Sequence, residues 1–308
     1  MSIHFDSLSR RDLLRVALGT GACVLTGQFA MAETILRKPI PKTAESLPAI
    51  GLGTWQTFDV SATPSARAPL KEVLRRFVRA GGSVIDLSPM YGKSEGVVGD
   101  LATELDVRKQ LFLATKVWTS GRDAGVRQME ESLKRLRTVK IDLMQVHNLV
   151  DYRTHLVTLR RWKEQGRVRY IGVTHYTASA YSELERVIAS EELDFVQINY
   201  SLGERDAEQR ILPLAAEKRL AVLINRPFAA GQLFRRARSK PLPAWSEEIG
   251  CKSWAQFFLK FIVAHPAVTC ALPATSNLEH LIDNMRAGND PMPNAQARER
   301  MARYADAL

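Results

Sequence analysis

Residues 111–146 contain an apolar run, LFLATKV (111–117), a helical pattern, VRQMEESLKRL (126–136), and a second apolar run, IDLMQV (141–146). The two apolar runs are short and almost uninterrupted, which is typical of strands that are buried on both faces of a parallel sheet. The segment between them has apolar residues at helical spacing and charged residues on the other side. The stretch therefore predicts a strand, a helix and a second strand parallel to the first.

This alternation occurs about eight times from Leu47 onward. Further strand patterns lie at 84–87, 170–173, 195–199, 221–224 and 268–272, and further helical patterns at 70–80 and 278–285. Such a chain forms either an open doubly wound sheet or a closed barrel. Gly51-Leu52-Gly53-Thr54-Trp55 lacks the third glycine of a dinucleotide-binding turn and does not open a helix. The number of repeats favours an α/β fold of the (β/α)8 TIM-barrel class.

The domain organisation follows from the same patterns. No low-complexity linker interrupts the chain between Leu47 and Gly288, so residues 33–308 are expected to form a single barrel domain. Residues 235–250 are rich in arginine, proline and polar groups, which predicts a long loop after the seventh strand. Loops at the carboxyl face of a barrel commonly carry function.

Residues 1–32 have the pattern of an export signal. Arg10 and Arg11 precede an uncharged run that ends in the small-residue pattern Ala30-Met31-Ala32. The paired arginines indicate the bacterial twin-arginine translocation machinery as a partner and the periplasm as the destination. A membrane anchor is the alternative, but glycine, threonine and glutamine interrupt the run, whereas a spanning helix needs about 20 mostly apolar residues. We expect no stable membrane span in the mature protein.

The composition excludes several classes of protein. Of the 308 residues, 45% are hydrophobic and 25% are charged, as in an ordinary globular protein. The formal net charge is +10, but the basic residues are scattered, so nucleic acid is not expected as a partner. Cys251 and Cys270 lack the spacing of a zinc or redox site, and one disulfide between them is left open. We expect a monomer without a metal site.

Four polar, ionisable side chains lie at or just after the ends of predicted strands. Asp86 and Lys116 end two of the strands, His147 ends the next, and Tyr91 follows Asp86 in a loop. Each one alone has a structural explanation, such as an ion pair or packing. Side chains at the carboxyl ends of barrel strands converge, however, and four such residues on consecutive strands indicate a catalytic site.

The chemistry of this set fits the reduction of a carbonyl group, which needs an acid close to the oxygen on which charge develops. Tyr91 is the candidate acid, and Lys116 is the candidate cation that would favour its phenolate over a normal pKa of about 10. Asp86 would pair with Lys116, and His147 would orient the carbonyl oxygen by donating a hydrogen bond. None of the four transfers hydride, so a nicotinamide cofactor is required.

Five short stretches occur in an informative order: Ile50–Trp55, Val84–Asp86 with Tyr91-Gly92 and Ser94-Glu95, Ala114–Val117, Gln145–Asn148, and Leu272–Asn277. In this order they resemble the successive motifs of the aldo-keto reductase family. The resemblance implies NAD(P)H-dependent reduction of small aldehydes or ketones, with the four ionisable residues as the family's catalytic tetrad. It favours NADP(H) over NAD(H). A barrel that binds the cofactor or senses redox state with little turnover is the alternative.

The resemblance also implies which residues hold the ligands. Trp55 and Trp118 would help to wall the substrate pocket, with hydrophobic packing as the alternative explanation. The positions implied for the cofactor are Thr174 and His175 beside the carboxamide, Gln197 on the carboxamide, Asn225, Arg226 and Phe228 near the nicotinamide ring, Thr275, Ser276 and Asn277 at the adenosine phosphate, and Asn284 at adenine.

The sequence departs from the family's pattern at three of these places. Thr174-His175 replaces the usual Ser-Asn, and Asn225 stands where an aromatic residue commonly stacks on the nicotinamide ring. Neither Ala274 nor Ser276 is the Lys or Arg that often contacts the 2′-phosphate of NADP. We therefore expect weaker discrimination of NADP over NAD than a cationic clamp would give.

Overall fold

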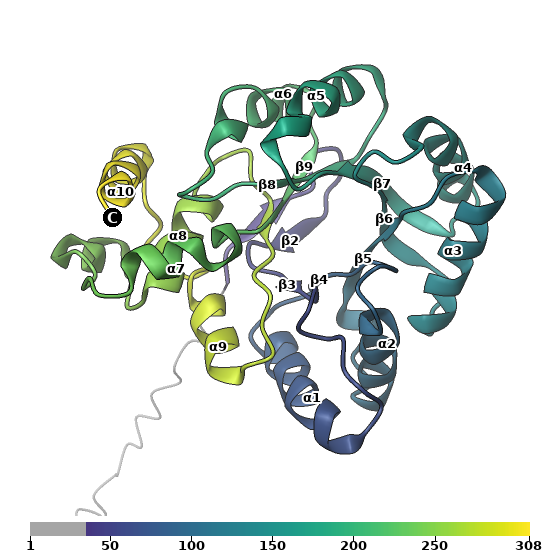
Figure 1. Cartoon of the computed structure of the whole chain (residues 1–308), viewed down its shortest axis with the longest axis horizontal. Helices are drawn as coiled ribbons and strands as arrows, with labels where there is room; N and C mark the ends of the chain where they lie inside the picture. Colours follow the sequence, from purple (N-terminus) through teal and green to yellow (C-terminus); the bar gives the residue numbers. More distant parts are fainter. Residues whose placement is uncertain (1–34) are drawn as a thin grey trace, which may run out of the picture. The chain divides into compact units, whose positions relative to one another are not determined.

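The computed structural model describes residues 35–308, so the predicted signal at 1–32 and the predicted domain boundary at residue 33 lie outside the described residues. Eight parallel strands form one sheet in which neighbours in the sequence are also neighbours in space (Figure 1). The strands are β3 (Leu52–Gly53), β4 (Val84–Asp86), β5 (Phe112–Val117), β6 (Ile141–His147), β7 (Val168–Thr174), β8 (Phe195–Asn199), β9 (Ala221–Asn225) and β10 (Cys270–Ala271).

The two outer strands of this sheet, β3 and β10, are joined by further backbone contacts. Ile50 bridges Ala271 in parallel, and Gly53 bridges Ala274. The amide of Gly51 donates to the carbonyl of Ala271 at 2.8 Å. A side chain at Gly51 would lie 2.8 Å from the Leu272 side chain and 2.9 Å from the Val84 carbonyl oxygen, so this approach requires glycine. The contacts close the sheet, and the predicted (β/α)8 barrel is confirmed.

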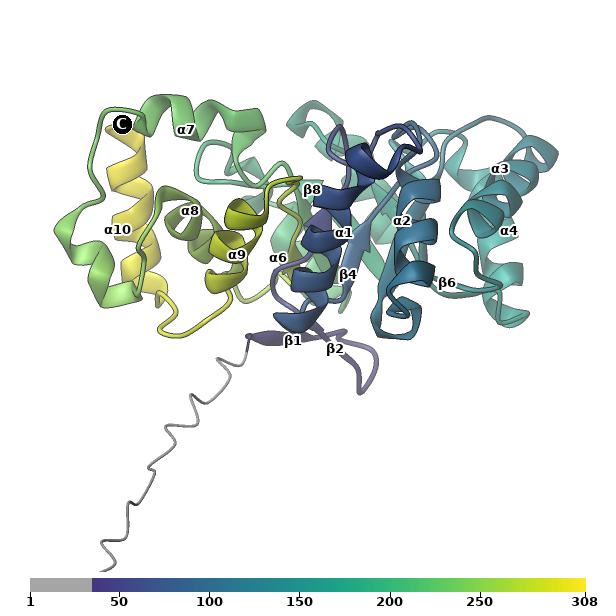
Figure 2. The same cartoon turned by 90° about the horizontal axis from the view of Figure 1, so that it is seen from below.

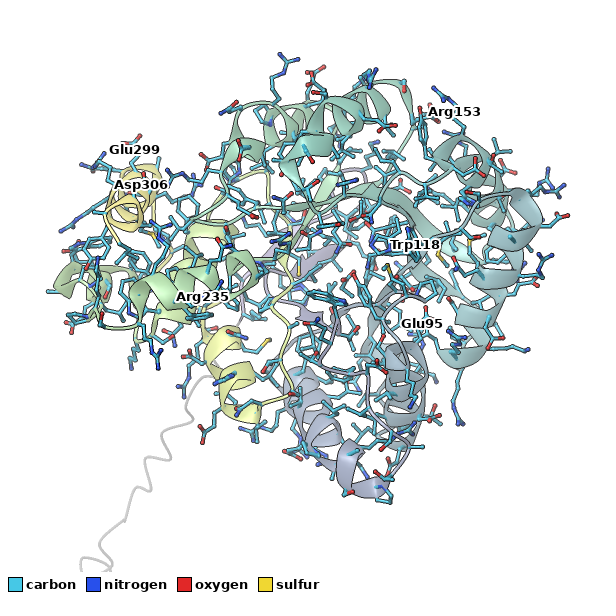
Figure 3. All side chains as sticks on the ribbon, viewed as in Figure 1. Glu95, Trp118, Arg153, Arg235, Glu299 and Asp306 are labelled. Atoms are coloured by element: carbon cyan, nitrogen blue, oxygen red, sulfur yellow. The ribbon has the colours of Figure 1, made fainter. Side chains whose placement is uncertain are left out.

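A helix follows each barrel strand and lies outside the sheet (Figures 1 and 2). Charged side chains such as Arg153, Glu299 and Asp306 lie on the outer helices (Figure 3), as expected for helices with one apolar face. No helix within residues 35–308 has the length and apolar character needed to cross a membrane. The helices are α1 (Pro64–Arg79), α2 (Ser94–Glu104), α3 (Arg122–Arg135), α4 (Tyr152–Glu164), α5 (Tyr181–Ser190), α6 (Ile211–Glu217), α8 (Trp254–Val263) and α9 (Leu278–Arg286), with α10 (Ala295–Asp306) at the carboxyl end.

The segment 235–250 is not the continuous loop that its composition predicts. It begins within the helix α7 (Gln232–Ala237) and includes a 3-10 helix, Ala244–Ile249. The ring of Trp245 packs 5.6 Å from that of Phe257 on α8 and 6.1 Å from that of Tyr304 on α10. Packing of these aromatic rings against one another orders a segment that is otherwise polar, and it outweighs the local signals for a loop.

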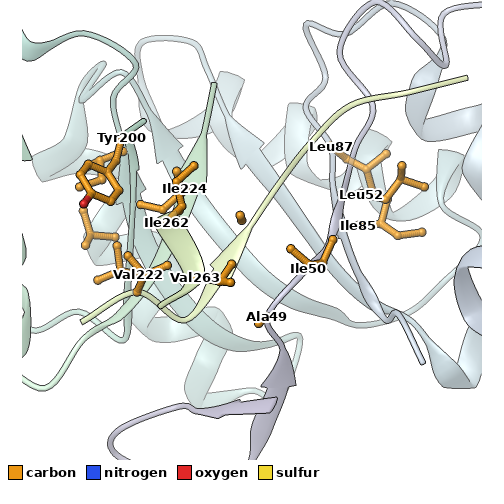
Figure 4. Packing of buried hydrophobic residues seen from close by; sticks show 14 of the residues in the cluster. Ala49, Ile50, Leu52, Ile85, Leu87, Tyr200, Val222, Ile224, Ile262 and Val263 are labelled. Carbon is orange, nitrogen blue, oxygen red and sulfur yellow. The ribbon is translucent and has the colours of Figure 1, made fainter. Parts of the chain in front are cut away.

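Two layers of apolar side chains form the core. Outward-facing strand residues, including Ile85, Val222 and Ile224, pack against the surrounding helices (Figure 4). Their sequence neighbours Val84, Ala221 and Leu223 belong to a second cluster that fills the barrel. The antiparallel hairpin of β1 (Arg37–Pro39) and β2 (Ser46–Pro48) adds Ile40 and Leu47 to this second cluster and covers the amino end of the barrel (Figure 2).

Candidate active site

The inward-facing side chains change from apolar to polar toward the carboxyl ends of the strands. Because side chains alternate between the two faces of a strand, residues two apart point into the barrel together. Val84 is followed by Asp86, Ala114 by Lys116, and Leu143 by Gln145 and then His147. The lower positions belong to the interior apolar cluster, whereas the upper ones are polar and nonetheless buried. The three strands β4, β5 and β6 therefore contribute to a polar layer at one end of an apolar barrel.

Lys116 and Asp86 form a buried ion pair in this layer. Lys116 Nζ donates to Asp86 Oδ1 at 2.7 Å and to the carbonyl of Leu87 at 2.6 Å. Burial alone would lower the pKa of Lys116, but the charges and hydrogen bonds of Asp86 and Tyr91 raise it above its usual value. The ammonium is therefore charged at physiological pH, as expected from the sequence.

Tyr91 lies beside this ammonium. A turn that starts at Ser88 places it there, with the Tyr91 amide donating to the Ser88 carbonyl at 3.0 Å. Lys116 Nζ lies 4.9 Å from the centre of the Tyr91 ring. Burial raises the pKa of Tyr91, and Lys116 opposes this effect without reversing it. As expected from the sequence, Lys116 acts to lower the pKa of Tyr91, but the larger effect of burial keeps the phenol protonated.

His147, at the end of β6, completes the set. Its ring centre lies 6.2 Å from that of Tyr91, at an interplanar angle of 85°, and 6.3 Å from that of Trp118. Burial lowers the pKa of His147 to about 3, with further contributions from Lys116 and His175. The imidazole is thus neutral at physiological pH and carries a single N–H. The structure brings together all four ionisable residues that the sequence singled out.

Polar groups that the resemblance assigns to the carboxamide also lie in this layer. Thr174 pairs with His147 and Gln197 on the adjacent strands. Gln197 Oε1 accepts a hydrogen bond of 2.7 Å from Gln145 Nε2, which leaves the amide nitrogen of Gln197 as a donor. The ring of His175 is engaged locally, because its Nδ1 lies 3.1 Å from the amide nitrogen of Tyr176. His175 is thus held by its own loop, in keeping with its departure from the family's pattern.

The residues at and after the end of β9 that the resemblance assigns to the nicotinamide ring make different kinds of contact. Asn225 Nδ2 donates to the carbonyl of His175 at 3.4 Å, while its buried Oδ1 has no partner among the described residues. Arg226 contacts the Tyr176 carbonyl at 3.5 Å and a Glu204 carboxylate oxygen at 3.8 Å. The ring of Phe228 packs 4.8 Å from that of Phe234, so its visible role is apolar packing.

The residues assigned to the adenosine end surround the start of α9. Asn277 Oδ1 accepts from the amides of Glu279 at 2.8 Å and His280 at 3.1 Å, and so caps this helix. Thr275 Oγ1 accepts from the Asn277 amide at 3.0 Å. Ser276 is exposed in the same turn, and Asn284 is buried on α9. Asn277 therefore has a structural role in the described chain.

The predicted pocket walls are open to solvent. Trp55 is 53% exposed and Trp118, labelled in Figure 3, is 41% exposed, so burial in a core does not account for either ring. Met90, which the sequence reasoning missed, is equally exposed and precedes Tyr91. Cys251 and Cys270 are both buried and free, and the open question of a disulfide is answered. Residues 35–308 contain no cluster of His, Cys, Asp and Glu that could hold a metal ion.

Sequence reasoning missed two buried residues that contact the site. Ser88 Oγ lies 3.3 Å from His147 Nδ1, and Gln145 binds Gln197. A signal for both was present in the strand alternation, because Ser88 follows Asp86 by two positions and Gln145 precedes His147 by two.

Comparisons with known proteins agree with this geometry. The sequence model described as "Aldo/keto reductase family" matches residues 49–300. Methylglyoxal reductase YeaE of Escherichia coli is 29% identical over 248 residues, which are 78% of this chain and 84% of that protein. Aldo-keto reductase YhdN of Bacillus subtilis is 31% identical over 199 residues, covering 60% of this chain and 59% of that protein. An aldo/keto reductase from Klebsiella pneumoniae, crystallised with NADP and acetate, is 26% identical with a TM-score of 0.69, over 84% of this chain and 92% of that one.

Proposed function

The chain belongs to the aldo/keto reductase family, and we propose that Asp86, Tyr91, Lys116 and His147 are the residues with which it reduces small aldehydes or ketones. It is an NAD(P)H-dependent oxidoreductase. The observation that carries the assignment is the convergence of a protonated phenol, a neutral imidazole and a buried ammonium at the carboxyl ends of adjacent strands.

The four side chains divide the chemistry between them. The bound nicotinamide cofactor supplies the hydride. Tyr91 holds the proton that the carbonyl oxygen receives, and Lys116 stabilises the phenolate that remains. His147 donates its N–H to the same oxygen and so orients the carbonyl group. Asp86 holds Lys116 in place and compensates its charge in the buried layer.

The polar layer fits a nicotinamide cofactor. Asn225 Oδ1 is buried without a partner in the described chain, although buried polar atoms are normally satisfied. Gln197 presents a donor in the same layer. The cofactor is NADP(H), as in the relative from Klebsiella pneumoniae that was crystallised with NADP and in a second structure with NADPH. Gln197, Thr174 and Asn225 would hold its carboxamide end.

Replacing Tyr91 with Phe tests the assignment because it removes only the hydroxyl group. We expect carbonyl reduction to fall by about 10²–10⁴-fold, the usual contribution of general acid catalysis, while the fold is preserved. Single-turnover oxidation of NADPH with methylglyoxal measures the loss, and fluorescence titration with NADPH should give an unchanged Kd. Near-wild-type reduction by a folded Tyr91→Phe variant would refute the assignment and favour a cofactor-binding or redox-sensing barrel with little turnover.

We also propose that residues 1–32 direct the protein to the periplasm through the twin-arginine machinery. Arg10, Arg11 and the ending Ala30-Met31-Ala32 support this. That route carries folded proteins, so the cofactor can bind before transport. Replacing both arginines with Lys should leave precursor in the cytoplasm. Unchanged recovery of the double variant from the periplasm would contradict the proposal.

A further inference from the structure

Ser88 is a fully buried serine whose hydroxyl group faces His147. Its Oγ lies 3.3 Å from His147 Nδ1, although the two residues are 59 positions apart in the sequence. The backbone carbonyl of Ser88 accepts from the Tyr91 amide at 3.0 Å, so the turn that places Tyr91 uses the backbone of Ser88. The side chain of Ser88 is therefore not needed for that hydrogen bond.

The other hydrogen bond of the Ser88 hydroxyl indicates which atom donates between Ser88 Oγ and His147 Nδ1. The Met90 amide points to Ser88 Oγ at 3.4 Å and can only donate, so it occupies a lone pair of that oxygen. Within residues 35–308, Ser88 Oγ has one other partner, His147 Nδ1. If Nδ1 carried the ring proton, the hydroxyl proton of Ser88 would be buried without an acceptor, which is unfavourable. The arrangement that satisfies every group has Ser88 donating to Nδ1.

We propose that Ser88 is a positioning residue that fixes the ring of His147 with Nδ1 as acceptor and Nε2–H directed to the substrate carbonyl. The proposal rests on the function assigned above. The neutral state of the imidazole supports it, because a ring with one proton can be either a donor or an acceptor at each nitrogen. The other nitrogen, Nε2, is left for a ligand beside Tyr91.

A ring without this hydrogen bond loses its fixed orientation. Rotation about χ2 would exchange the positions of ring nitrogens and carbons. Within residues 35–308, no other hydrogen bond of the His147 ring opposes this rotation. The contacts with Tyr91 and Trp118 are ring packing and do not distinguish nitrogen from carbon. Ser88 is thus the group that selects the edge of the ring that faces the substrate.

Nitrogen-15 NMR of ring-labelled full-length protein tests the proposal without measuring activity. We expect wild-type His147 to be protonated at Nε2, with the chemical shift of a hydrogen-bonded acceptor at Nδ1. In Ser88→Ala, the Nδ1 signal should move toward that of a free acceptor. A wild-type ring protonated at Nδ1, or an Nδ1 signal that is unchanged in Ser88→Ala, would overturn the proposal even if Tyr91 proves to be the acid.

Kinetics with a matched control provide the second readout. Ser94 is also fully buried, and its hydroxyl has no partner among the described residues, so Ser94→Ala removes the same atom from a neighbouring site without removing a hydrogen bond. We expect Ser88→Ala to lower kcat/KM for methylglyoxal by roughly two- to tenfold, the value of one hydrogen bond, with an unchanged Kd for NADPH. Ser94→Ala should have wild-type kcat/KM. Equal losses in the two variants would show a packing effect and overturn the proposal.

Discussion

Lys116 Nζ lies 2.7 Å from Asp86 Oδ1, and the two side chains are only 1% and 7% exposed. A buried carboxylate depends on its partner far more than a surface carboxylate does, since water cannot replace the lost cation. Lys116 Nζ also donates to the carbonyl of Leu87. The pair therefore links the ends of β4 and β5 and holds the ammonium beside Tyr91 at the same time.

Lys116→Met should destabilise the protein by about 3–5 kcal/mol, because it leaves the Asp86 carboxylate buried without a cation. Adding Asp86→Asn should recover most of this loss, since the amide carries no charge. Urea denaturation of the single and double variants measures both effects. In activity, Lys116→Met should add little to the loss caused by Tyr91→Phe, because the two residues act as one unit.

The matched control is Lys163→Met. Lys163 Nζ pairs with Asp194 at 2.6 Å, but the lysine side chain is 41% exposed. Surface pairs of this kind contribute about 0–1 kcal/mol. If the two Lys→Met variants lost equal stability, the buried charge of Asp86 would not be the cause.

The lowered pKa of His147 predicts how stability depends on pH. The unfolded chain binds a proton at this residue below its ordinary pKa of 6.5, whereas the folded protein does so only near pH 3. The stability that depends on a neutral His147 is therefore fully present above about pH 6.5, and it is lost as the pH falls toward 3. The contribution of His147 is about 1.4 kcal/mol per pH unit within that window.

His147→Gln should remove this contribution and make the denaturation midpoint less sensitive to pH between 4 and 6. Burial also lowers the pKa of His265, to about 4, but this residue is present in both proteins and cancels in the comparison. Parallel midpoint curves for wild type and variant would show that the folded protein binds a proton at His147 as readily as the unfolded chain.

The strand pattern made the fold predictable, and the errors have local physical causes. The run 195–199 coincides with β8, and 111–117 differs from β5 by one residue. Helix α1 begins at Pro64, six residues before the expected start at 70. The sequence did not indicate these first turns because Pro64 and Pro69 are unfavourable in the interior of a helix. Pro64 is favourable there, since the first turn of a helix leaves its amides unbonded.

The proposed catalytic residues and the residues that contact them differ in how clearly the sequence marks them. Asp86 and His147 end β4 and β6, and Lys116 lies one residue before the end of β5, so position in the strand alone marks them. Ser88 and Gln145 matter because of partners that lie 59 and 52 positions away, and a single sequence does not show which inward-facing residues meet. The dominance of burial over the charge of Lys116 at Tyr91 likewise depends on the packed neighbours.

Arg226 is one candidate to replace the missing cation at the 2′-phosphate, but its contacts favour a role that does not distinguish NADPH from NADH. It reaches Tyr176 after β7 and Glu204 after β8, on the side of β9 away from Thr275 and β10. We expect Arg226→Gln to weaken the binding of NADPH and NADH alike, by roughly 10- to 100-fold each, since a charge-assisted hydrogen bond contributes about 1.5–3 kcal/mol.

Fluorescence titration with both cofactors measures the effect. The matched control is Arg219→Gln, because Arg219 precedes β9 at the opposite end of the barrel and donates to the Pro41 carbonyl at 2.7 Å. It should leave both affinities unchanged. A selective loss of NADPH in Arg226→Gln would identify this residue as the 2′-phosphate contact. Wild-type preference for NADPH above about a thousandfold, or roughly 4 kcal/mol, would contradict the expectation of weak discrimination.

The hydrogen bond of 2.7 Å from Gln145 Nε2 to Gln197 Oε1 predicts that Gln145 acts on the cofactor through Gln197. By occupying the only acceptor of that amide, it leaves Gln197 to present its amide nitrogen to the carboxamide oxygen. Gln145→Met should weaken NADPH binding by roughly two- to tenfold, the value of one hydrogen bond. Gln197→Met should weaken NADPH binding by at least the same factor. The double variant should bind NADPH no more weakly than Gln197→Met alone. Isothermal titration of the three variants completes a double-mutant cycle. Additive losses would show instead that the unpartnered Gln145 Oε1 contacts the cofactor directly.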